Sequence, residues 1–379
     1  MHDRLFDAEL RSFQTSLRRF IAAEIAPSFP RWAEAGIVDR GVFAAAGAQG
    51  FLCMTQSPDH GGMGLDFRYS ALVAEELSAQ GFGDVFFSLH SDIVAPYIEH
   101  HGSDVLKAAY LPGMAAGTLI GAIAMTEPGT GSDLQAITTR AIDDGDHWVI
   151  DGTKTFISNG HLCDLCIVAV NTEGDGEGWQ KMSLIVVEAN DPGFVRGRRL
   201  DKVGLRAQDT CELHFEGCRV PKGRLLGPRG GGFALLMQEL ARERLVVAIG
   251  CVAAAGAALE TTTTYVKNRV AFGKPLAKQQ HTRFKVAEMA TEVEIGRTFV
   301  DRCIEELVAG ELTAERASMA KWWTSEMLGR VVDDCVQLHG GYGYMREVPI
   351  AQAWLDARVQ RIYAGTTEIM KEIVARSRL

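Results

Sequence analysis

The stretch MQELARERLVVAIGCVAAAGAALETTTTYVKNRV, residues 237–270, decides the fold class of this 379-residue chain. It contains no proline, and its only breakers are single glycines, so it predicts one long helix. Its most apolar part, residues 245–259, is fifteen residues long, short of the ~18 that indicate a membrane span. The alanines and glycines favour a helix buried in a close-packed bundle, and we expect no membrane insertion.

Further helices surround this stretch in the C-terminal segment, residues 229–379. ERASMAKWWTSEMLGRVVDDCVQL (315–338) again runs without a proline, and TTEIMKEIVARS (366–377) closes the chain. Several long helices in sequence predict a four-helix bundle as the last domain.

Residues 118–228 have a different pattern, in which short β-rich runs alternate with turn residues, as is typical of a compact β-domain. In HWVIDGTKTFIS (147–158), Asp151-Gly152 stands between two β-rich runs and predicts a two-residue hairpin turn. KMSLIVVEA (181–189) and CELHFEGCRV (211–220) continue the pattern of short strands.

The N-terminal segment, residues 1–117, is predicted to be mostly helical. One helical face is formed by Leu10, Phe13, Leu17, Phe20 and Ile21. The order of helices, strands and helices predicts the α+β class.

Charge and cysteine content exclude several classes of protein. The net charge is −9 and no long basic stretch is present, so a nucleic-acid partner is not expected. The eight cysteines indicate free buried thiols, as expected of a reducing compartment. Cys163 and Cys166 form a lone C-x-x-C without a second pair at zinc spacing, so we predict strand residues and no metal.

The first residues bear on localisation. Asp3, Asp7 and Glu9 make this segment too acidic for a transit peptide, and no apolar signal sequence precedes them. A cytoplasmic location is therefore expected.

Five segments carry patterns that periodicity does not explain. They are AMTEPGTGSD (124–133), KTFISNG (154–160), RVAFGKPL (269–276), QLHGGYGYM (337–345) and YAGTTEIM (363–370). In this order they resemble the acyl-CoA dehydrogenase family across essentially the whole chain, most closely its long-chain branch.

The resemblance implies FAD as cofactor. The residues that it places around the flavin ring are Met125, Thr126, Gly131, Ser132, Phe156, Ile157 and Ser158. Glycines let the backbone approach a ligand, hydroxyls can bond the ring edge, and Phe156 offers an aromatic face where the family often has Trp.

The resemblance assigns the rest of the FAD to other segments. They contribute Arg269, Phe272, Gln280, Gln337, Gly340, Gly341, Thr366 and Glu368. Arg269 would meet the pyrophosphate of a neighbouring subunit's FAD, which implies a homotetramer with shared flavin sites. Ala271 replaces a threonine common in relatives, and Glu368 is expected to accept a ribose hydroxyl or to cap a helix.

Desaturation of an acyl thioester needs a carboxylate base, and much of the family carries it where this chain has Ala364. In the isovaleryl and long-chain branches the base comes instead from a helix with a Glu-Arg-Leu pattern, which Glu243, Arg244 and Leu245 match. Independently of the family, the neighbours of Glu243 on one helical face are all apolar or glycine; they are Leu236, Leu240, Val246, Val247 and Gly250. A carboxylate on such a face tends to have a raised pKa, which suits a base, although a structural pairing with an arginine is the alternative.

The substrate residues implied by the resemblance are Ser132, Leu240, Arg244, Tyr363, Ala364 and Gly365. The backbone N–H of Ala364 would bond the thioester oxygen. Glu243 would remove the α-proton while hydride passes to flavin N5.

The expected function is FAD-dependent α,β-dehydrogenation of a long-chain or branched acyl-CoA, with an electron-transfer flavoprotein as electron acceptor. Two alternatives stay open. One is the same reaction on a chain bound to a carrier protein. The other is a flavin-binding relative without dehydrogenase turnover, such as an interaction protein or a flavin monooxygenase.

Overall fold

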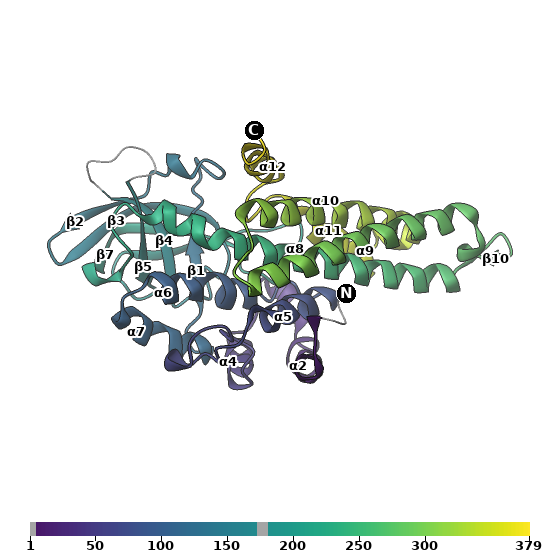
Figure 1. The fold of residues 1–379 in the computed structure, drawn as a ribbon, viewed down its shortest axis with the longest axis horizontal. Helices are drawn as coiled ribbons and strands as arrows, with labels where there is room; N and C mark the ends of the chain where they lie inside the picture. The colour runs from purple at the N-terminus through teal and green to yellow at the C-terminus, as the bar shows by residue number, and fades with distance from the viewer. Residues whose placement is uncertain (1–4, 173–180) are drawn as a thin grey trace.

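The computed structural model describes residues 5–172 and 181–379, and three regions follow one another along the chain (Figure 1). A helical region comes first, a mixed sheet follows, and long helices extend away from the sheet. The predicted α+β class is confirmed. The boundaries predicted for the three segments stay a prediction.

The N-terminal region is helical, as predicted. Its α-helices are α2 (Ala8–Phe20), α3 (Phe29–Ala35), α4 (Gly41–Ala48), α5 (Phe67–Ala79), α6 (Ala95–His101) and α7 (Asp104–Ala115). Asp7 caps α2 by accepting a hydrogen bond from the Leu10 N–H. Leu10, Leu17 and Phe20 of α2 are buried, so the predicted apolar face is confirmed.

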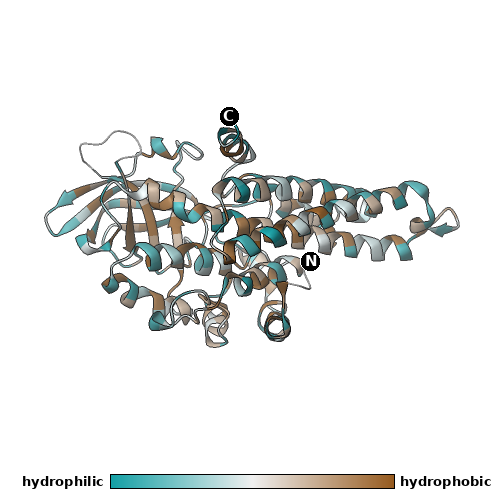
Figure 2. Cartoon of the chain, viewed as in Figure 1, coloured by the Kyte–Doolittle hydropathy of each residue, from teal (hydrophilic) through white to brown (hydrophobic). Residues whose placement is uncertain are grey.

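The middle region is an eight-stranded mixed sheet. Its strands are β1 (Gly121–Ala124), β2 (Arg140–Asp144), β3 (His147–Ile157), β4 (Leu165–Thr172), β5 (Met182–Glu188), β6 (Phe194–Arg199), β7 (Cys211–Pro221) and β8 (Leu225–Leu226). The strand order is β6-β7-β3-β2-β4-β5-β8, and β1 pairs with β4 in parallel. β4 and β5 are buried along almost their whole length and lie as brown strands within the sheet in Figure 2.

The predicted hairpin turn at Asp151-Gly152 is wrong. β3 continues through both residues, and the turn to β2 lies earlier, between Asp144 and His147. The ladder between β3 and β7 shifts register between Ile150 and Gly152, where Gly152 has φ 151°. An Asp-Gly pair therefore marks a β-bulge here, because glycine serves both structures.

The C-terminal region is the predicted bundle. The long helices are α8 (Gly232–Asn268), α9 (Gln280–Val308) and α10 (Ala314–His339), α11 (Pro349–Ala357) packs on α8 and α10, and α12 (Thr367–Arg376) follows. A short hairpin of β9 (Val270–Ala271) and β10 (Lys274–Pro275) joins α8 to α9 at the far end of the bundle (Figure 1).

By length and composition alone, α8 is long and apolar enough to cross a membrane. The sequence estimate considered only residues 245–259, whereas the helix has 37 residues. Of its most apolar stretch, 56% is buried within the protein, as happens in core helices, so this is weak evidence for a span. The absence of membrane insertion stays a prediction.

All eight cysteines are free and buried, as predicted. Cys166 lies on β4, whereas Cys163 lies just before this strand. Both side chains belong to the core of the sheet region.

The bulge in β3 generates a stability prediction. A Cβ at Gly152 would lie 2.7 Å from the Thr139 Cα, whereas a Cβ at Gly145, with φ 68°, would meet nothing within 4 Å. Gly145→Ala should cost only the left-handed penalty of about 1–2 kcal/mol. Gly152→Ala should cost a further ~1–3 kcal/mol, because the backbone must move. Urea unfolding of both variants tests this, and equal midpoints would contradict it.

Candidate functional site

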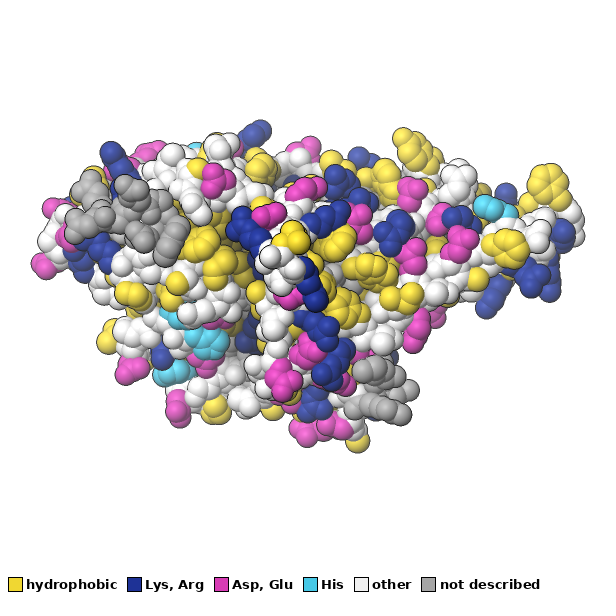
Figure 3. Space-filling model, turned by 45° about the horizontal axis from the view of Figure 1, so that its top comes forward, with side chains coloured by type: hydrophobic (Ala, Val, Ile, Leu, Met, Phe, Trp, Pro, Cys, Tyr) yellow, Lys and Arg dark blue, Asp and Glu magenta, His cyan; other side chains and the backbone are white. Residues whose placement is uncertain are grey.

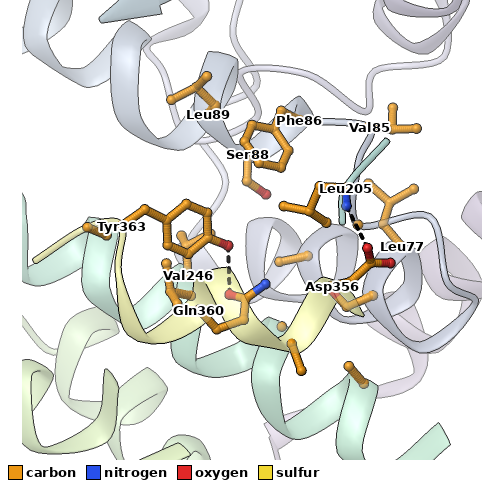
Figure 4. A pocket seen from close by; sticks show the side chains of 18 of the residues that line it. Leu77, Val85, Phe86, Ser88, Leu89, Leu205, Val246, Asp356, Gln360 and Tyr363 are labelled. Atoms are coloured by element: carbon orange, nitrogen blue, oxygen red, sulfur yellow. Dashed lines mark hydrogen bonds between the residues drawn. The ribbon is translucent and has the colours of Figure 1, made fainter. Parts of the chain in front are cut away.

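A cavity of about 430 Å³ lies where the three regions meet. Five parts of the chain line most of it: residues 74–93, 123–126, 156–158, 243–261 and 349–364. Figure 4 shows Leu77, Val85, Phe86 and Leu89 on one side and Val246 and Tyr363 on the other. Segments far apart in sequence therefore form one mostly apolar site.

Glu243 of α8 lines this cavity, with its side chain buried. The Tyr97 hydroxyl of α6 donates a hydrogen bond to Glu243 Oε1 at 2.8 Å. Burial raises the pKa of Glu243 to about 7, although Tyr97 and the charge of Arg244 act in the opposite direction. A carboxylate with this pKa can accept and release a proton near neutral pH.

The arginine pairing considered for Glu243 is not what the structure shows. The Arg244 Nη1 donates to Ser318 Oγ of α10 at 3.2 Å, and its Nε has no hydrogen-bond partner in the described structure. Burial lowers the pKa of Arg244. Arg244 contacts α10, and neither it nor Leu240 lines the cavity.

The turn before α12 lines the same cavity as Glu243. Tyr363 and Ala364 line the cavity, and the Tyr363 hydroxyl donates to Gln360 Oε1 at 2.6 Å (Figure 4). Ala364 has φ 52° and Gly365 has φ 91°, so both residues are left-handed. Gly365 does not line the cavity; a Cβ there would lie 2.5 Å from Met370 Cε.

Residues of the sheet region form another wall. Five of those that line the cavity were predicted for the flavin site: Met125, Thr126, Phe156, Ile157 and Ser158; Ile123 and Leu205 line it as well. Phe156 is 67% exposed, with φ 60°, at the end of β3. An exposed aromatic ring beside hydroxyl groups suits stacking against a planar ligand.

A buried ion pair supports this wall. Lys154 Nζ donates to Glu127 Oε1 at 2.8 Å and to the Met125 carbonyl oxygen at 2.9 Å. Glu127 also accepts hydrogen bonds from the N–H groups of Thr138 and Thr139. Lys154 and its partners therefore fix the backbone after β1 against β3.

Gly131 and Ser132 lie in the exposed loop between β1 and β2, and neither residue lines the cavity. Thr366 caps α12 by accepting from the Ile369 N–H at 3.4 Å. Glu368 lies exposed in the first turn of α12, where hydrogen bonds from its own backbone N–H and from the Thr366 hydroxyl hold its pKa below the usual range. Thr366 is therefore the N-cap residue of α12, and the expected contact of Glu368 with a ribose hydroxyl stays a prediction.

The remaining predicted flavin residues lie outside the cavity, towards the far end of the bundle. Arg269 and Phe272 belong to the β9–β10 connection, Gln280 begins α9, and Gln337, Gly340 and Gly341 lie at and after the end of α10. Basic and hydrophobic side chains gather at this end of the bundle in Figure 3, and Phe272 is 96% exposed. The Arg269 guanidinium lies 5.9 Å from the ring centre of Tyr342. These groups are separate from their own chain's cavity.

Sequence reasoning missed several residues of the site. Tyr97 bonds Glu243, Asp356 and Gln360 line the cavity, and Asp356 Oδ1 accepts from the Leu205 N–H. The apolar surroundings of Glu243 indicate that some polar partner must exist. No helical period along one segment identifies Tyr97, which lies 146 residues away.

Close to Glu243, one cluster in the described part of the chain has the composition of a metal site: His100, His101 and Glu239. Hydrogen bonds account for it, because both imidazoles lie within 3.0 Å of Glu239 Oε1. The prediction that the protein has no metal stays untested.

Comparison with known proteins extends this description. Three family profiles match in order: the acyl-CoA dehydrogenase N-terminal domain over residues 7–118, the middle domain over 122–218 and the C-terminal domain over 230–379. The mitochondrial long-chain specific acyl-CoA dehydrogenase of Sus scrofa is 48% identical over 98% of this chain and 87% of its own length. The mitochondrial isovaleryl-CoA dehydrogenase of Oryza sativa subsp. japonica is 32% identical, over 98% and 91%.

Solved structures agree with these sequence matches. An acyl-CoA dehydrogenase from Geobacillus kaustophilus has a TM-score of 0.96 at 47% identity, covering 98% of both chains. A glutaryl-CoA dehydrogenase from Mycobacterium smegmatis in complex with FADH2 has a TM-score of 0.91 at 29% identity, covering 99% of this chain and 95% of the other. With the same three domains in the same order, this chain belongs to the acyl-CoA dehydrogenase family of oxidoreductase enzymes.

Proposed function

We propose that the protein is an FAD-dependent dehydrogenase that desaturates long-chain acyl-CoA thioesters between Cα and Cβ, with Glu243 as the base. The observation that carries the proposal is the position of Glu243: it is buried, has a pKa of about 7, and lines the same cavity as Ala364. A methyl group at 364 cannot accept a proton. The carboxylate of Glu243 supplies that capacity from α8.

The residues of the sheet wall fit a flavin. Thr126 and Ser158 supply hydroxyl groups at the cavity, and the exposed ring of Phe156 supplies a flat apolar surface. When bound, FAD would accept the hydride from Cβ. The polypeptide must then hold the thioester, polarise its carbonyl and remove the α-proton.

Glu243 and Ala364 divide this work. The Ala364 N–H would donate to the thioester oxygen and stabilise the negative charge that develops there. Glu243 Oε would take the α-proton, while the Tyr97 hydroxyl holds the carboxylate in place. Val246 and Val247 line the cavity on the same helix as Glu243, and an acyl chain packed against them would displace water and strengthen both interactions.

The shape of the cavity supports a long acyl chain. Lining residues on α8 extend from Glu243 to Thr261, which is about 27 Å along the helix axis. An extended chain of sixteen carbons measures ~18 Å at roughly 1.2 Å per bond. Beyond Glu243 the α8 wall consists largely of small residues: Gly250, Ala254, Ala257 and Ala258. A thioester of a carrier protein is the competing substrate, since the chemistry at Glu243 is identical.

Neighbouring subunits would complete the flavin sites. Arg269 and residues 337–341 are predicted to bind FAD, yet they do not line the cavity of their own chain. A homotetramer in which each bundle end reaches another subunit resolves this separation. We further propose an electron-transfer flavoprotein as electron acceptor and a cytoplasmic location.

The purified protein should be yellow, with one FAD per subunit and the mass of a tetramer. Arg269→Met should weaken FAD binding by removing a charged phosphate contact, typically worth about 1.5–3 kcal/mol. Arg283→Met, a basic residue one turn into α9, is the matched control. Sedimentation and flavin absorbance measure both properties. A monomer with full FAD occupancy would exclude shared sites.

Glu243→Gln should lower the rate of flavin reduction by at least ~10²–10⁴-fold while FAD binding is retained. In the unchanged protein the rate should rise with pH through about 7, because the raised pKa delays ionisation of the base. Stopped-flow flavin bleaching across pH 5–9 measures both effects. Bleaching of Glu243→Gln at the unchanged rate would refute the proposal.

Glu239→Gln is the matched control, one helical turn away on α8. The negative charge of Glu239 raises the pKa of Glu243, so this variant should stay active with a lower pH midpoint. The double change Glu243→Gly with Ala364→Glu should restore part of the rate and favour shorter chains, because the new side chain crowds the cavity.

Ala254→Leu should shorten the preferred acyl chain, because the larger side chain projects into the cavity. We expect kcat/KM for a sixteen-carbon acyl-CoA to fall at least tenfold relative to a four-carbon one, within the ~1–3 kcal/mol cost of overpacking. Ala253→Leu, the neighbour outside the cavity lining, is the control. If kcat/KM of Ala254→Leu fell equally for both substrates, the long acyl chain would not lie against Ala254.

A further inference from the structure

The turn that carries Ala364 has an unfavourable backbone. Ala364 has φ 52° and is followed by Gly365 with φ 91°. A residue with a Cβ is strained in this region and keeps such a conformation only where the surroundings impose it. Contacts from outside the turn must therefore hold Ala364 at the cavity.

Lys321 of α10 makes the closest polar contact to the backbone of this turn. Its Nζ donates to the Gly365 carbonyl oxygen at 2.6 Å. The side-chain contacts on either side are different in kind: Tyr363 bonds Gln360, and Thr367 bonds Glu326. Those contacts hold side chains next to the turn, whereas Lys321 holds its main chain.

The ammonium of Lys321 is an unusual group to find at this position. Lys321 is fully buried, and among residues 5–172 and 181–379 no carboxylate lies within ion-pair distance of its Nζ. Burial lowers the pKa of Lys321 to about 8; the charge of Arg244 acts in the same direction, whereas the more distant Glu368 carboxylate acts in the opposite one. The side chain is therefore still protonated at neutral pH. Burying a cation without a carboxylate partner costs free energy. The charge-assisted hydrogen bond from Lys321 to the Gly365 carbonyl oxygen offsets part of that cost.

The packing around Gly365 also restricts the position of the turn. A Cβ at Gly365 would lie 2.5 Å from Met370 Cε, so the turn is packed against the buried side of α12. Met370 packs against one side of the turn and Lys321 bonds its carbonyl oxygen, so these two contacts together fix the position of the turn.

We propose that Lys321 is a positioning residue that fixes the Ala364–Gly365 turn, so that the Ala364 N–H stays in place to bond the thioester oxygen. This inference rests on the proposed function, in which that N–H stabilises the developing charge. Lys321 itself touches neither the cavity nor the reacting atoms.

The main test is Lys321→Met, which keeps the length of the side chain and removes the donor. We expect FAD content and tetramer mass to be unchanged and flavin reduction to slow by about 10–100-fold, as misplacement of a catalytic group by ~1 Å does. The pH midpoint set by Glu243 should move little, because the base is untouched. Ser325→Ala is the matched control, since Ser325 is buried one turn further along α10 and bonds only within its own helix.

A spectroscopic readout separates positioning from general stability. The carbonyl stretch of a bound, non-reducible acyl thioester reports how strongly the thioester oxygen is hydrogen-bonded. It should lie at lower frequency in the unchanged protein and in Ser325→Ala than in Lys321→Met. An unshifted carbonyl stretch in Lys321→Met, or unchanged flavin reduction, overturns the proposal.

Lys321→Gln is the second variant, because it keeps a shorter donor and should be intermediate in rate. If neither variant accumulates as folded holoprotein, Lys321 is needed for folding and the proposal is wrong. Glu243→Gln distinguishes the two levels of inference. Unchanged reduction in Glu243→Gln refutes the proposed function, whereas slow Glu243→Gln with fast Lys321→Met refutes only the role of Lys321.

Discussion

The exclusion of water from the Glu243 carboxylate is the constraint on which the rest of the site depends. In water this group would be an ordinary acid with a pKa near 4.3, a weak base at neutral pH. Its position on the buried side of α8 raises the pKa to about 7. That shift comes from burial, and the cavity that Glu243 lines lies where the three regions of the chain meet. The three-domain arrangement can therefore be understood as the enclosure of one carboxylate beside a ligand cavity.

The hydrogen bond from Tyr97 shows how this enclosure is balanced. A buried carboxylate with no donor would be so poorly solvated that it would stay protonated, and a full ion pair would make it too weak a base. A neutral hydroxyl at 2.8 Å lies between these extremes. The nearby arginine, Arg244, is directed to Ser318 instead, so it contributes its field without forming a salt bridge with Glu243.

Much of the fold was predictable because it depends on local periodicity. The apolar face of α2, the long α8 and the alternation of helical and strand regions all follow from spacing along one segment. Asp151-Gly152 shows the limit: the pair fits a hairpin turn or a bulge equally well, and pairing with β7 decides in favour of the bulge. The burial of Glu243 was predictable for the same reason as the helices. Tyr97, Lys321 and the separation of Arg269 from the cavity were not, since each depends on segments that only tertiary structure brings together or keeps apart.

The residue at 364 and the residue at 243 constrain each other. Both positions line one cavity, and two carboxylates there would repel, which would push one pKa far above neutral. A glutamate at 364 would also place a long side chain on a left-handed backbone, where the small methyl group of Ala364 already carries strain. In the proposed mechanism, Ala364 leaves Glu243 room to approach the substrate, and the backbone of the turn serves as a hydrogen-bond donor. Under this proposal the alanine is the structural complement of a base on α8, and its strained turn is held from α10 by the hydrogen bond of Lys321 to the Gly365 carbonyl oxygen.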